Sequence, residues 1–338
     1  MQYQLPVVDD TLVWDAWLAL YKVPAISVAL ELEIFESLDA MPASAGELAE
    51  RRGFNERGLK ALLPMLKQLG FLMQHGAVYQ LSEAGRHYML KSSAFYWGGV
   101  FTRLAPTIVA HKLLLETVNN ERENAAKNRP ADGWESGHVD MEMARQVTAF
   151  MHSHSVPAAV GMTHTCDFSG VRRVLDVGGG SGCFSIALAR RYPTISCTIM
   201  ELPTICTLAQ QYVADAGVDA QIDTVTVDMF RQDWPKGYDA HFFSNIFHDW
   251  SIETCVELAK KSYAALAPGG CILLHEMLLD DNGTEPGPAV AFSLLMAMGT
   301  KGQQFTFAQL AEILQAAGFI DITWQQSYGY YSLVKAGK

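Results

Sequence analysis

The sequence has no paired cysteines and no excess of basic charge. Its six cysteines are scattered without a C-x-x-C pair, so neither a disulfide framework nor a zinc site is expected, and no metal site is predicted. Such thiols are typical of a reducing compartment, which favours the cytoplasm. Lysine and arginine number 25 against 36 aspartate and glutamate residues, and the net charge of −11 disfavours nucleic acid as a partner.

Long uncharged apolar runs are not evident either. Because no such run reaches about 18 residues, neither a membrane-spanning helix nor a membrane partner is predicted. The N-terminus contains early acidic residues and no basic region, which disfavours a signal peptide. Hydrophobic residues still make up 49% of the 338 residues, which is enough for a large core.

The first part of the chain, residues 1–98, is predicted to be α-rich. Residues 12–38 are apolar almost all round, which predicts a helix buried in a core or against a second subunit. Two helices are predicted to follow, one in "SAGELAERRGF" with a capping box from Ser44 to Glu47, and one in "NERGLKALLPMLKQLGFL" with Asn55 as its N-cap. The segment "FLMQHGAVYQLS" reads as a β-hairpin, and helix, helix and hairpin together outline a winged helix.

A winged helix often binds DNA, but the second helix here is poorly suited to that role. Its basic side chains are only Arg57, Lys60 and Lys67, with Glu56 opposing them. A DNA-binding helix needs a stronger basic face. The favoured interpretation of residues 1–98 is therefore a scaffold or dimerisation domain.

From residue 171 onward, strands alternate with helices of about 10–16 residues, which predicts a parallel sheet covered on both faces. The fold class is therefore α/β, with a Rossmann-like doubly wound sheet over residues 171–338. Two strands around Tyr328-Gly329 are expected to add an antiparallel hairpin at one edge. Residues 99–170 are predicted to be a helical connector with a polar insert at 119–137.

The stretch "RVLDVGGGSG", residues 173–182, has four glycines within five residues directly after an apolar run. A P-loop would need a lysine that is missing here. A dinucleotide fingerprint would need its third glycine at the position of Cys183. The spacing D-x-G-x-G-x-G is met in full by Asp176, Gly178, Gly180 and Gly182. This spacing resembles motif I of class I S-adenosylmethionine methyltransferases, whose cofactor needs no phosphate-binding loop.

Residues at the ends of the next two strands support that cofactor. Glu201, followed by Leu202, ends the strand "CTIMEL", where a carboxylate can accept hydrogen bonds from two ribose hydroxyls. Asp228 after the following strand can accept from the adenine amino group. Met229 and Phe230 can hold the adenine ring between them.

A closer resemblance covers nearly the whole chain and is weakest over 100–145. The segments "VLDVGGGSG", "TIMELP", "VDMF", "FHDWSIETCVELAKKSYAALAPGG", "LLHEMLL" and "AEILQAAGF" resemble the caffeate and hydroxyindole O-methyltransferase family. The N-terminal outline is similar too. The resemblance implies a homodimer that methylates hydroxyl groups of small aromatic molecules with S-adenosylmethionine.

Carried over by position, His248 in "HDW" is similar to the family's general base. A phenol, with a pKa of about 10, is a poor nucleophile until a base accepts its proton, and histidine can accept and release one near neutral pH. Glu276 matches an acid that orients this histidine. Asp249 either contacts the substrate or caps the helix that begins near Ser251.

Two positions depart from the family pattern. The family's second acid lies in a "G-R-E-R-T" segment, whose counterpart here is "GQQFT", so Gln304 takes the acid's place. An amide can hydrogen-bond the substrate but cannot stabilise an imidazolium by charge. Ser244 replaces a basic residue near the cofactor in many relatives, and one basic contact is lost.

Four further residues are candidates for the substrate pocket. Met151 and His154 belong to "FMHSHS", which matches a family helix that lines the pocket. Phe292 and Met296, from "AFSLLMAM", are candidate pocket walls, with ordinary helix core as the alternative.

The favoured function is methyl transfer to a hydroxyl of a flat, small aromatic substrate. Transfer to carbon or nitrogen remains open, because one fold and cofactor serve all three acceptors. A non-catalytic S-adenosylmethionine-binding regulator and a nicotinamide oxidoreductase are the alternatives from other classes. The sequence does not identify the acceptor.

Overall fold

A computed structural model describes residues 5, 7–93, 95–120 and 133–338 of the chain. Their contacts divide the chain into two compact units. The sheet unit comprises Met1–Thr11, Ala131–Leu278 and Phe307–Lys338, and the helical unit comprises Leu12–Pro130 and Leu279–Thr306. The predicted division into residues 1–98, 99–170 and 171–338 assigned a function to each segment of the chain. This division stays a prediction. Most of the polar insert at 119–137 lies outside the described residues.

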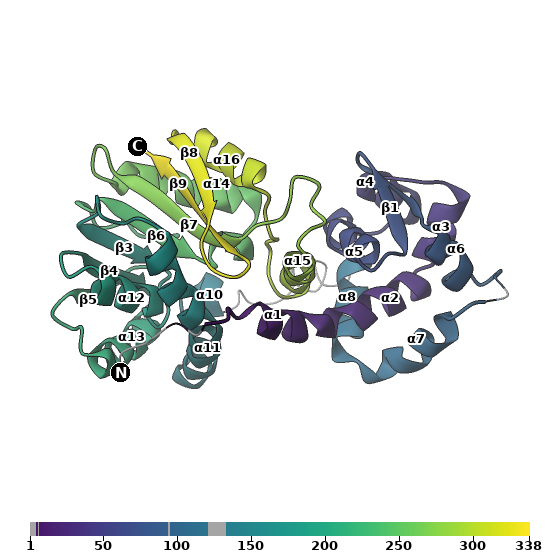
Figure 1. The fold of residues 1–338 in the computed structure, drawn as a ribbon, viewed down its shortest axis with the longest axis horizontal. Coiled ribbons are helices and arrows are strands. Elements are labelled where there is room, and N and C mark those ends of the chain that lie inside the picture. The colour runs from purple at the N-terminus through teal and green to yellow at the C-terminus, as the bar shows by residue number, and fades with distance from the viewer. Residues whose placement is uncertain (1–4, 6, 94, 121–132) are drawn as a thin grey trace. The chain divides into compact units, whose positions relative to one another are not determined.

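The sheet unit contains a seven-stranded sheet in the order β5-β4-β3-β6-β7-β9-β8 (Figure 1). The neighbouring strands from β5 to β7 pair in parallel, and β9 runs antiparallel to both of its neighbours, which confirms the predicted hairpin at the sheet edge. The strands are β3 Arg173–Val177, β4 Ser196–Glu201, β5 Ile222–Thr226, β6 Ala240–Ser244, β7 Cys271–Met277, β8 Ile320–Gln326 and β9 Tyr331–Gly337.

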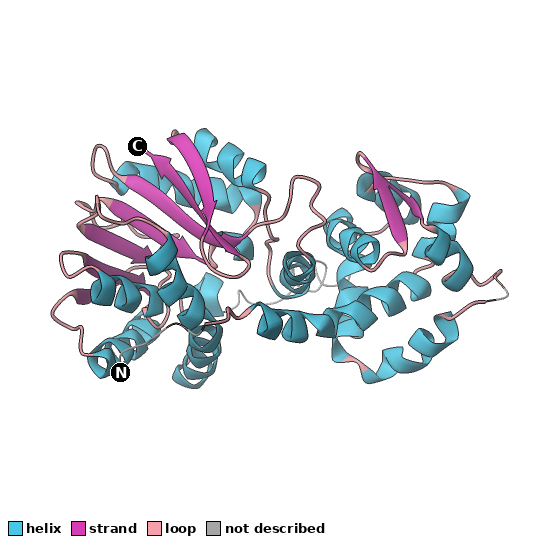
Figure 2. Ribbon diagram, viewed as in Figure 1, coloured by secondary structure: helices cyan, strands magenta, loops and turns pink. Residues whose placement is uncertain are grey.

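Helices cover both faces of this sheet, as predicted for a doubly wound fold (Figure 2). On one face α11, α12 and α13 pack against one another, and α14 packs against α16 on the other. The helices of the unit are α10 Gly133–Ser136, α11 Met141–Thr165, α12 Cys183–Arg191, α13 Pro203–Ala216, η3 Phe247–Asp249, α14 Ile252–Ala265 and α16 Phe307–Ala316. The strand order reverses at β3, which pairs with both β4 and β6, and ligands of doubly wound sheets bind at the carboxyl ends of the strands flanking such a point.

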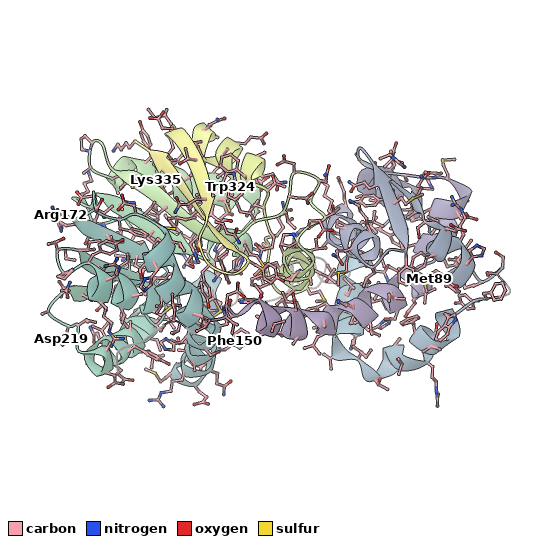
Figure 3. All side chains as sticks on the ribbon, in the orientation of Figure 1. Met89, Phe150, Arg172, Asp219, Trp324 and Lys335 are labelled. Carbon is pink, nitrogen blue, oxygen red and sulfur yellow. The ribbon has the colours of Figure 1, made fainter. Side chains whose placement is uncertain are left out.

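The strand sequences account for their places in the sheet. Strand β7, "CILLHEM", is buried at every position, as expected for a strand covered on both faces. Strand β8, "IDITWQQ", is exposed almost throughout and has a register irregularity between Ile320 and Thr323. Its Trp324, labelled in Figure 3, is 52% exposed. Polar residues and a bulge protect such an edge from pairing with other chains.

The helical unit confirms the predicted local signals. Ser44 forms the capping box of α4 with Glu47, Asn55 caps α5, and β1 and β2 form the hairpin. The elements are α1 Thr11–Leu18, η1 Ala19–Tyr21, α2 Lys22–Glu31, α3 Ile34–Ala40, α4 Ala45–Arg52, α5 Glu56–Gln68, β1 Leu72–His75, β2 Val78–Leu81, α6 Glu83–Tyr88, α7 Gly98–Leu104, η2 Ala105–Thr107, α8 Val109–Val118 and α15 Gly287–Gly299.

One expectation about residues 12–38 needs correction. They form separate helices rather than one, because Glu33 adopts a left-handed backbone with φ 54° between α2 and α3. The span Thr11–Glu31 has the length and the mean hydropathy, 1.3, of a membrane-crossing helix, but it is not uncharged, because it contains Asp15 and Lys22. A core helix passes the same test, and α2 is buried from Pro24 to Leu30.

The three basic side chains of α5 all have partners within the helical unit. Lys60 pairs with Glu56 at 2.9 Å, and Lys67 donates to the Thr284 hydroxyl at 2.7 Å. The Arg57 guanidinium donates to four backbone carbonyls at the end of α15 and just beyond it, those of Met296, Ala297, Thr300 and Gly302. This helix therefore uses its basic residues to hold its own unit together.

Candidate active site

The carboxyl edge of the sheet collects most of the predicted site residues. Parallel strands end at the same edge, so side chains at or just after these ends lie near one another. From the sheet unit the structure places there Asp176 and the glycines after β3, Glu201 and Leu202 after β4, Asp228, Met229 and Phe230 after β5, Ser244, His248 and Asp249 at and after β6, and Glu276 near the end of β7.

The glycine loop between β3 and α12 adopts a conformation that few other residues tolerate. Gly178, Gly180 and Gly182 have φ values of +67°, +55° and +73°. A Cβ atom on Gly178 would lie 2.6 Å from Cδ1 of Ile246, so that glycine backs closely onto the next segment. A Cβ on Gly180 would meet nothing within 4 Å, so this glycine faces open space. The loop thus presents bare backbone at the edge of the sheet.

Asp176 is held inside the sheet unit. Its side chain is 2% exposed, and the Ser185 hydroxyl donates to Oδ2 at 2.6 Å. Burial raises the pKa of Asp176 to about 6, although the hydrogen bonds from Ser185 oppose that shift. A direct contact between Asp176 and a cofactor therefore stays a prediction.

Glu201 is fixed by two backbone donors. Its Oε1 accepts from the N–H of Gly180 at 3.2 Å, and its Oε2 accepts from the N–H of Leu202 at 2.9 Å. Burial raises the pKa of Glu201 to about 7, against the effect of these two donors. Further hydroxyl donors at this carboxylate would favour its ionised form.

The loop at 228–234 is organised by the Asp228 carboxylate. Its Oδ1 accepts from the N–H groups of Phe230 and Arg231 at 2.9 and 3.1 Å, and its Oδ2 pairs with the Arg231 guanidinium at 2.6 Å. The Phe230 ring packs edge-on against Trp250, with ring centres 4.6 Å apart. The roles of Asp228 and Phe230 toward adenine stay predictions.

His248 and Glu276 form a buried pair. His248 Nδ1 lies 3.4 Å from Glu276 Oε2, and the side chains are 2% and 1% exposed. Glu276 Oε1 accepts from the N–H groups of Ile246 and Phe247, at 3.2 and 3.1 Å. Burial and, to a smaller extent, the charge of Asp249 raise the pKa of Glu276 to about 8, although the backbone donors oppose both effects. One carboxylate therefore holds both the imidazole and the turn that carries it.

Asp249 does not cap the following helix. Helix α14 begins at Ile252, and Ser251 is its N-cap, with the hydroxyl accepting from the N–H of Thr254 at 3.3 Å. The capping alternative for Asp249 is therefore wrong, because Ser251 directly precedes the first helical residue. Asp249 Oδ1 instead lies 3.8 Å from His248 Nε2, and the Asp249 side chain is 37% exposed.

A buried histidine that the sequence reasoning missed contacts Ser244. The Ser244 hydroxyl lies 3.1 Å from His275 Nδ1, and His275 Nε2 lies 2.8 Å from the Ser327 hydroxyl. The His275 ring stacks on Tyr331 at 4.8 Å, and burial lowers the pKa of His275 to about 3. A neutral histidine with both nitrogens bonded is a structural element. Its signal was a second polar residue, beside Glu276, in the mostly apolar "CILLHEM".

Helix α11 contributes a second histidine that was not singled out. His152 Nδ1 lies 2.8 Å from the hydroxyl of Ser181 in the glycine loop, and its ring stacks on Tyr212 with centres 4.4 Å apart. The predicted pocket residue His154 packs against Phe150, labelled in Figure 3, at 5.3 Å. Burial lowers the pKa of His154 to about 4. Met151 is half-buried.

Three of the predicted pocket residues, Phe292, Met296 and Gln304, lie in the helical unit. Phe292 is 4% exposed and packs against Trp14 and Trp17, with ring centres 5.7 and 6.1 Å apart, which favours the helix-core alternative. Met296 is 8% exposed and Gln304 is 1% exposed. The N–H of Gln304 donates to the Ser293 hydroxyl at 3.2 Å.

The cysteines and acids offer no evident metal site. All six cysteines are buried free thiols. Among residues 5, 7–93, 95–120 and 133–338, no three histidine, cysteine, aspartate or glutamate side chains form a group that could hold a metal ion.

Comparisons with known proteins agree with this arrangement. Residues 112–320 match the O-methyltransferase domain, and residues 14–91 match the O-methyltransferase dimerisation domain. The 3-hydroxy-5-methyl-1-naphthoate 3-O-methyltransferase of Streptomyces sahachiroi is 31% identical over 92% of this chain and 90% of that protein. The L-tyrosine C(3)-methyltransferase of Streptomyces lavendulae is 28% identical over 89% of this chain and 84% of that protein.

A solved structure shows the same fold. The O-methyltransferase family 2 protein of Planctomyces limnophilus DSM 3776, in complex with apigenin, superposes with a TM-score of 0.85. It is 22% identical, and the match covers 99% of this chain and 98% of that one.

Proposed function

The chain belongs to the S-adenosylmethionine-dependent O-methyltransferases of aromatic natural-product type, and we propose that His248 is the general base that accepts the proton of the substrate hydroxyl. The observation that carries this proposal is the buried pairing of His248 with Glu276, 3.4 Å apart at the carboxyl edge of the sheet. A carboxylate at one ring nitrogen fixes the tautomer and leaves the other nitrogen able to accept a proton.

The residues at the sheet edge fit the cofactor, S-adenosylmethionine, which supplies a methyl group carried on a sulfonium. The open face of Gly180 lets the cofactor lie close to the backbone, and the Glu201 carboxylate fits a ribose diol. We assign the adenine ring to Met229 and Phe230. Asp176, Gly178, Gly182, Leu202, Asp228 and Ser244 complete the proposed cofactor site.

The reaction needs a base and an orienting environment more than an acid. With the proton of His248 on Nδ1, toward Glu276, the lone pair of Nε2 can take the proton of the acceptor hydroxyl. The resulting imidazolium is stabilised by the Glu276 carboxylate, and Asp249, 3.8 Å from Nε2, adds a second negative charge. A bound cofactor would supply the methyl group, whose bond to sulfur would break as the acceptor oxygen bonds to the methyl carbon, with a neutral thioether as the leaving group. Holding oxygen and methyl carbon in line would supply much of the rate.

We propose a small aromatic alcohol as the acceptor, with Met151 and His154 of the sheet unit as candidate pocket residues. The pocket roles predicted for Phe292, Met296 and Gln304, in the helical unit, stay predictions. The relative from Streptomyces sahachiroi is named for a hydroxynaphthoate substrate, which supports a flat, fused-ring acceptor. The dimerisation domain supports a homodimer as the working form, and the reduced cysteines fit the cytoplasm.

Transfer to an aromatic carbon is the second candidate. The relative from Streptomyces lavendulae is named as a tyrosine C(3)-methyltransferase, and its likeness to this chain extends over 89% of the sequence. A phenol that is deprotonated by the same histidine can also donate electrons through its ring carbon. Which atom is methylated is therefore a matter of how the acceptor is placed.

The test compares His248→Ala with the wild type on a panel of hydroxylated naphthoates and phenols with a labelled methyl donor. We expect His248→Ala to lose about 10²–10⁴-fold in kcat, with S-adenosylhomocysteine affinity unchanged. Product mass spectra after acid hydrolysis separate O-methyl from C-methyl products. Near-normal O-methylation by His248→Ala would contradict the proposal.

A further inference from the structure

Lys261 on α14 donates to the loop that follows β5. Its Nζ lies 2.8 Å from the carbonyl oxygens of Met229 and Phe230 and 2.9 Å from that of Gln232. The carbonyl of Met229 also accepts from the Trp234 indole N–H at 2.9 Å. No sequence motif marked this lysine, which lies in the middle of the helix "IETCVELAKKSYAA".

The donors and acceptors match in number. An ammonium group has three N–H donors and accepts nothing, and here three carbonyls of one short loop converge on it. From the other side, the Asp228 carboxylate accepts from the N–H groups of Phe230 and Arg231. The loop is therefore held by an acid at its N–H groups and by a lysine at its carbonyls.

The electrostatics of Lys261 fit this role. Partial burial lowers the pKa of Lys261, and the charges of Asp228 and Asp233 oppose that shift. A half-buried cation persists at such a place where its hydrogen bonds offset the loss of water. The neighbouring Lys260 makes no such contact and pairs with Glu257 on the surface at 2.9 Å.

We propose that Lys261 is a positioning residue that holds the 228–234 loop in the shape that receives the adenine ring of the cofactor. The inference rests on the proposed function, which assigns Met229 and Phe230 to adenine. Lys261 acts through the backbone of these two residues, so its loss leaves the reacting atoms and His248 in place. The cost falls on cofactor binding, because the loop must then be ordered at the moment of binding.

The experiment uses Lys261→Met, which keeps the aliphatic stem and removes all three donors, and the matched control Lys260→Met. The probes are S-adenosylhomocysteine and adenosine, measured by calorimetry, with steady-state kinetics alongside. We expect Lys261→Met to weaken both probes by about tenfold, because both contain adenine. The KM for S-adenosylmethionine should rise by a similar factor, while kcat and the KM for the acceptor hold and Lys260→Met behaves as wild type.

Hydrogen exchange provides a second measurement on the ligand-free protein. The amides of 229–233 should exchange faster in Lys261→Met, with those of the glycine loop unchanged. If Lys261→Met does not fold, Lys261→Gln and Lys261→Arg take its place, with weaker binding expected for the glutamine and a smaller change for the arginine.

The outcomes separate this inference from the proposed function. The positioning role would be overturned if Lys261→Met bound both probes with wild-type affinity. It would also be overturned if kcat fell and the KM for the acceptor rose by the same factor as the KM for S-adenosylmethionine. Failure of the wild-type protein itself to bind S-adenosylhomocysteine would instead overturn the assignment of the cofactor site.

Discussion

Glu276 holds His248 in two ways, one direct and one through the backbone. Its Oε2 lies 3.4 Å from the imidazole Nδ1, and its Oε1 accepts from two N–H groups of the turn that leads to His248. The 3.4 Å separation is long for a hydrogen bond, and such contacts often tighten when substrate binds. Burial raises the pKa of Glu276, so the ionised form that orients His248 becomes more populated as the pH rises.

Glu276→Gln should separate these two roles. The amide oxygen can still accept from the N–H groups of Ile246 and Phe247, so stability should change by less than about 1 kcal/mol. An amide N–H facing Nδ1 forces the imidazole proton onto Nε2, so kcat should fall by roughly 10³–10⁴-fold. Single-turnover rates and denaturant unfolding measure the two effects.

Glu253→Gln is the control for Glu276→Gln, because Glu253 is an exposed acid on α14. It should leave the rate unchanged and lower stability only slightly, because Glu253 lies in the first turn of α14, where an acid is favourable. A kcat for Glu276→Gln close to that of the wild type would show that the carboxylate does not orient His248.

Cofactor affinity should depend on pH through Glu201. A ribose diol donates to the ionised carboxylate, and the pKa of Glu201 in the free protein is raised to about 7. Affinity for S-adenosylhomocysteine should therefore be constant above about pH 7 and fall by up to about tenfold per pH unit below it. Calorimetry between about pH 5.5 and 8.5 tests this, and Glu201→Gln should flatten the curve.

The same group affects stability with the opposite sign. The folded-state pKa of Glu201 lies above its usual value of 4.5, so its contribution to stability is present below about pH 4.5 and is lost as the pH rises through about 7. Over that interval the ligand-free protein should lose stability while its cofactor affinity rises. If both quantities rise together in the wild type and Glu201→Gln changes neither, the assignment of Glu201 to the ribose is wrong.

Local signals in the sequence predicted much of the site. The glycine spacing after an apolar run located the loop at Gly178, and the alternation of strands and helices placed Glu201 and Glu276 at strand ends, where the structure has them. Parallel strands share one carboxyl edge, so these residues meet even though many residues separate them in the chain. A capping signal such as Ser44 is likewise readable because its partner lies three residues away.

Contacts between distant segments of the chain could not be predicted from such local signals. His152 reaches Ser181, His275 reaches Ser327, and Lys261 reaches Met229, each across at least 29 residues of chain. No periodicity marks such pairs, because either residue alone fits its own element. The break between α2 and α3 was missed as well, because the left-handed backbone of Glu33 is unusual for this residue type and has no local sequence signal.

Replacing Arg57 should lower the free energy of unfolding more than replacing an exposed charged residue of the helical unit. Its guanidinium donates to four carbonyls at and beyond the C-terminal end of α15, just before Gln304, at distances from 2.6 to 3.3 Å. Arg57→Met leaves these acceptors without their charged donor, so we expect a loss of about 3 kcal/mol in the free energy of unfolding. Lys60→Met on the same helix removes only an exposed ion pair and should cost less than about 0.5 kcal/mol. Urea unfolding of both variants decides the matter, since equal small effects would mean that the Arg57 contacts do not hold α15.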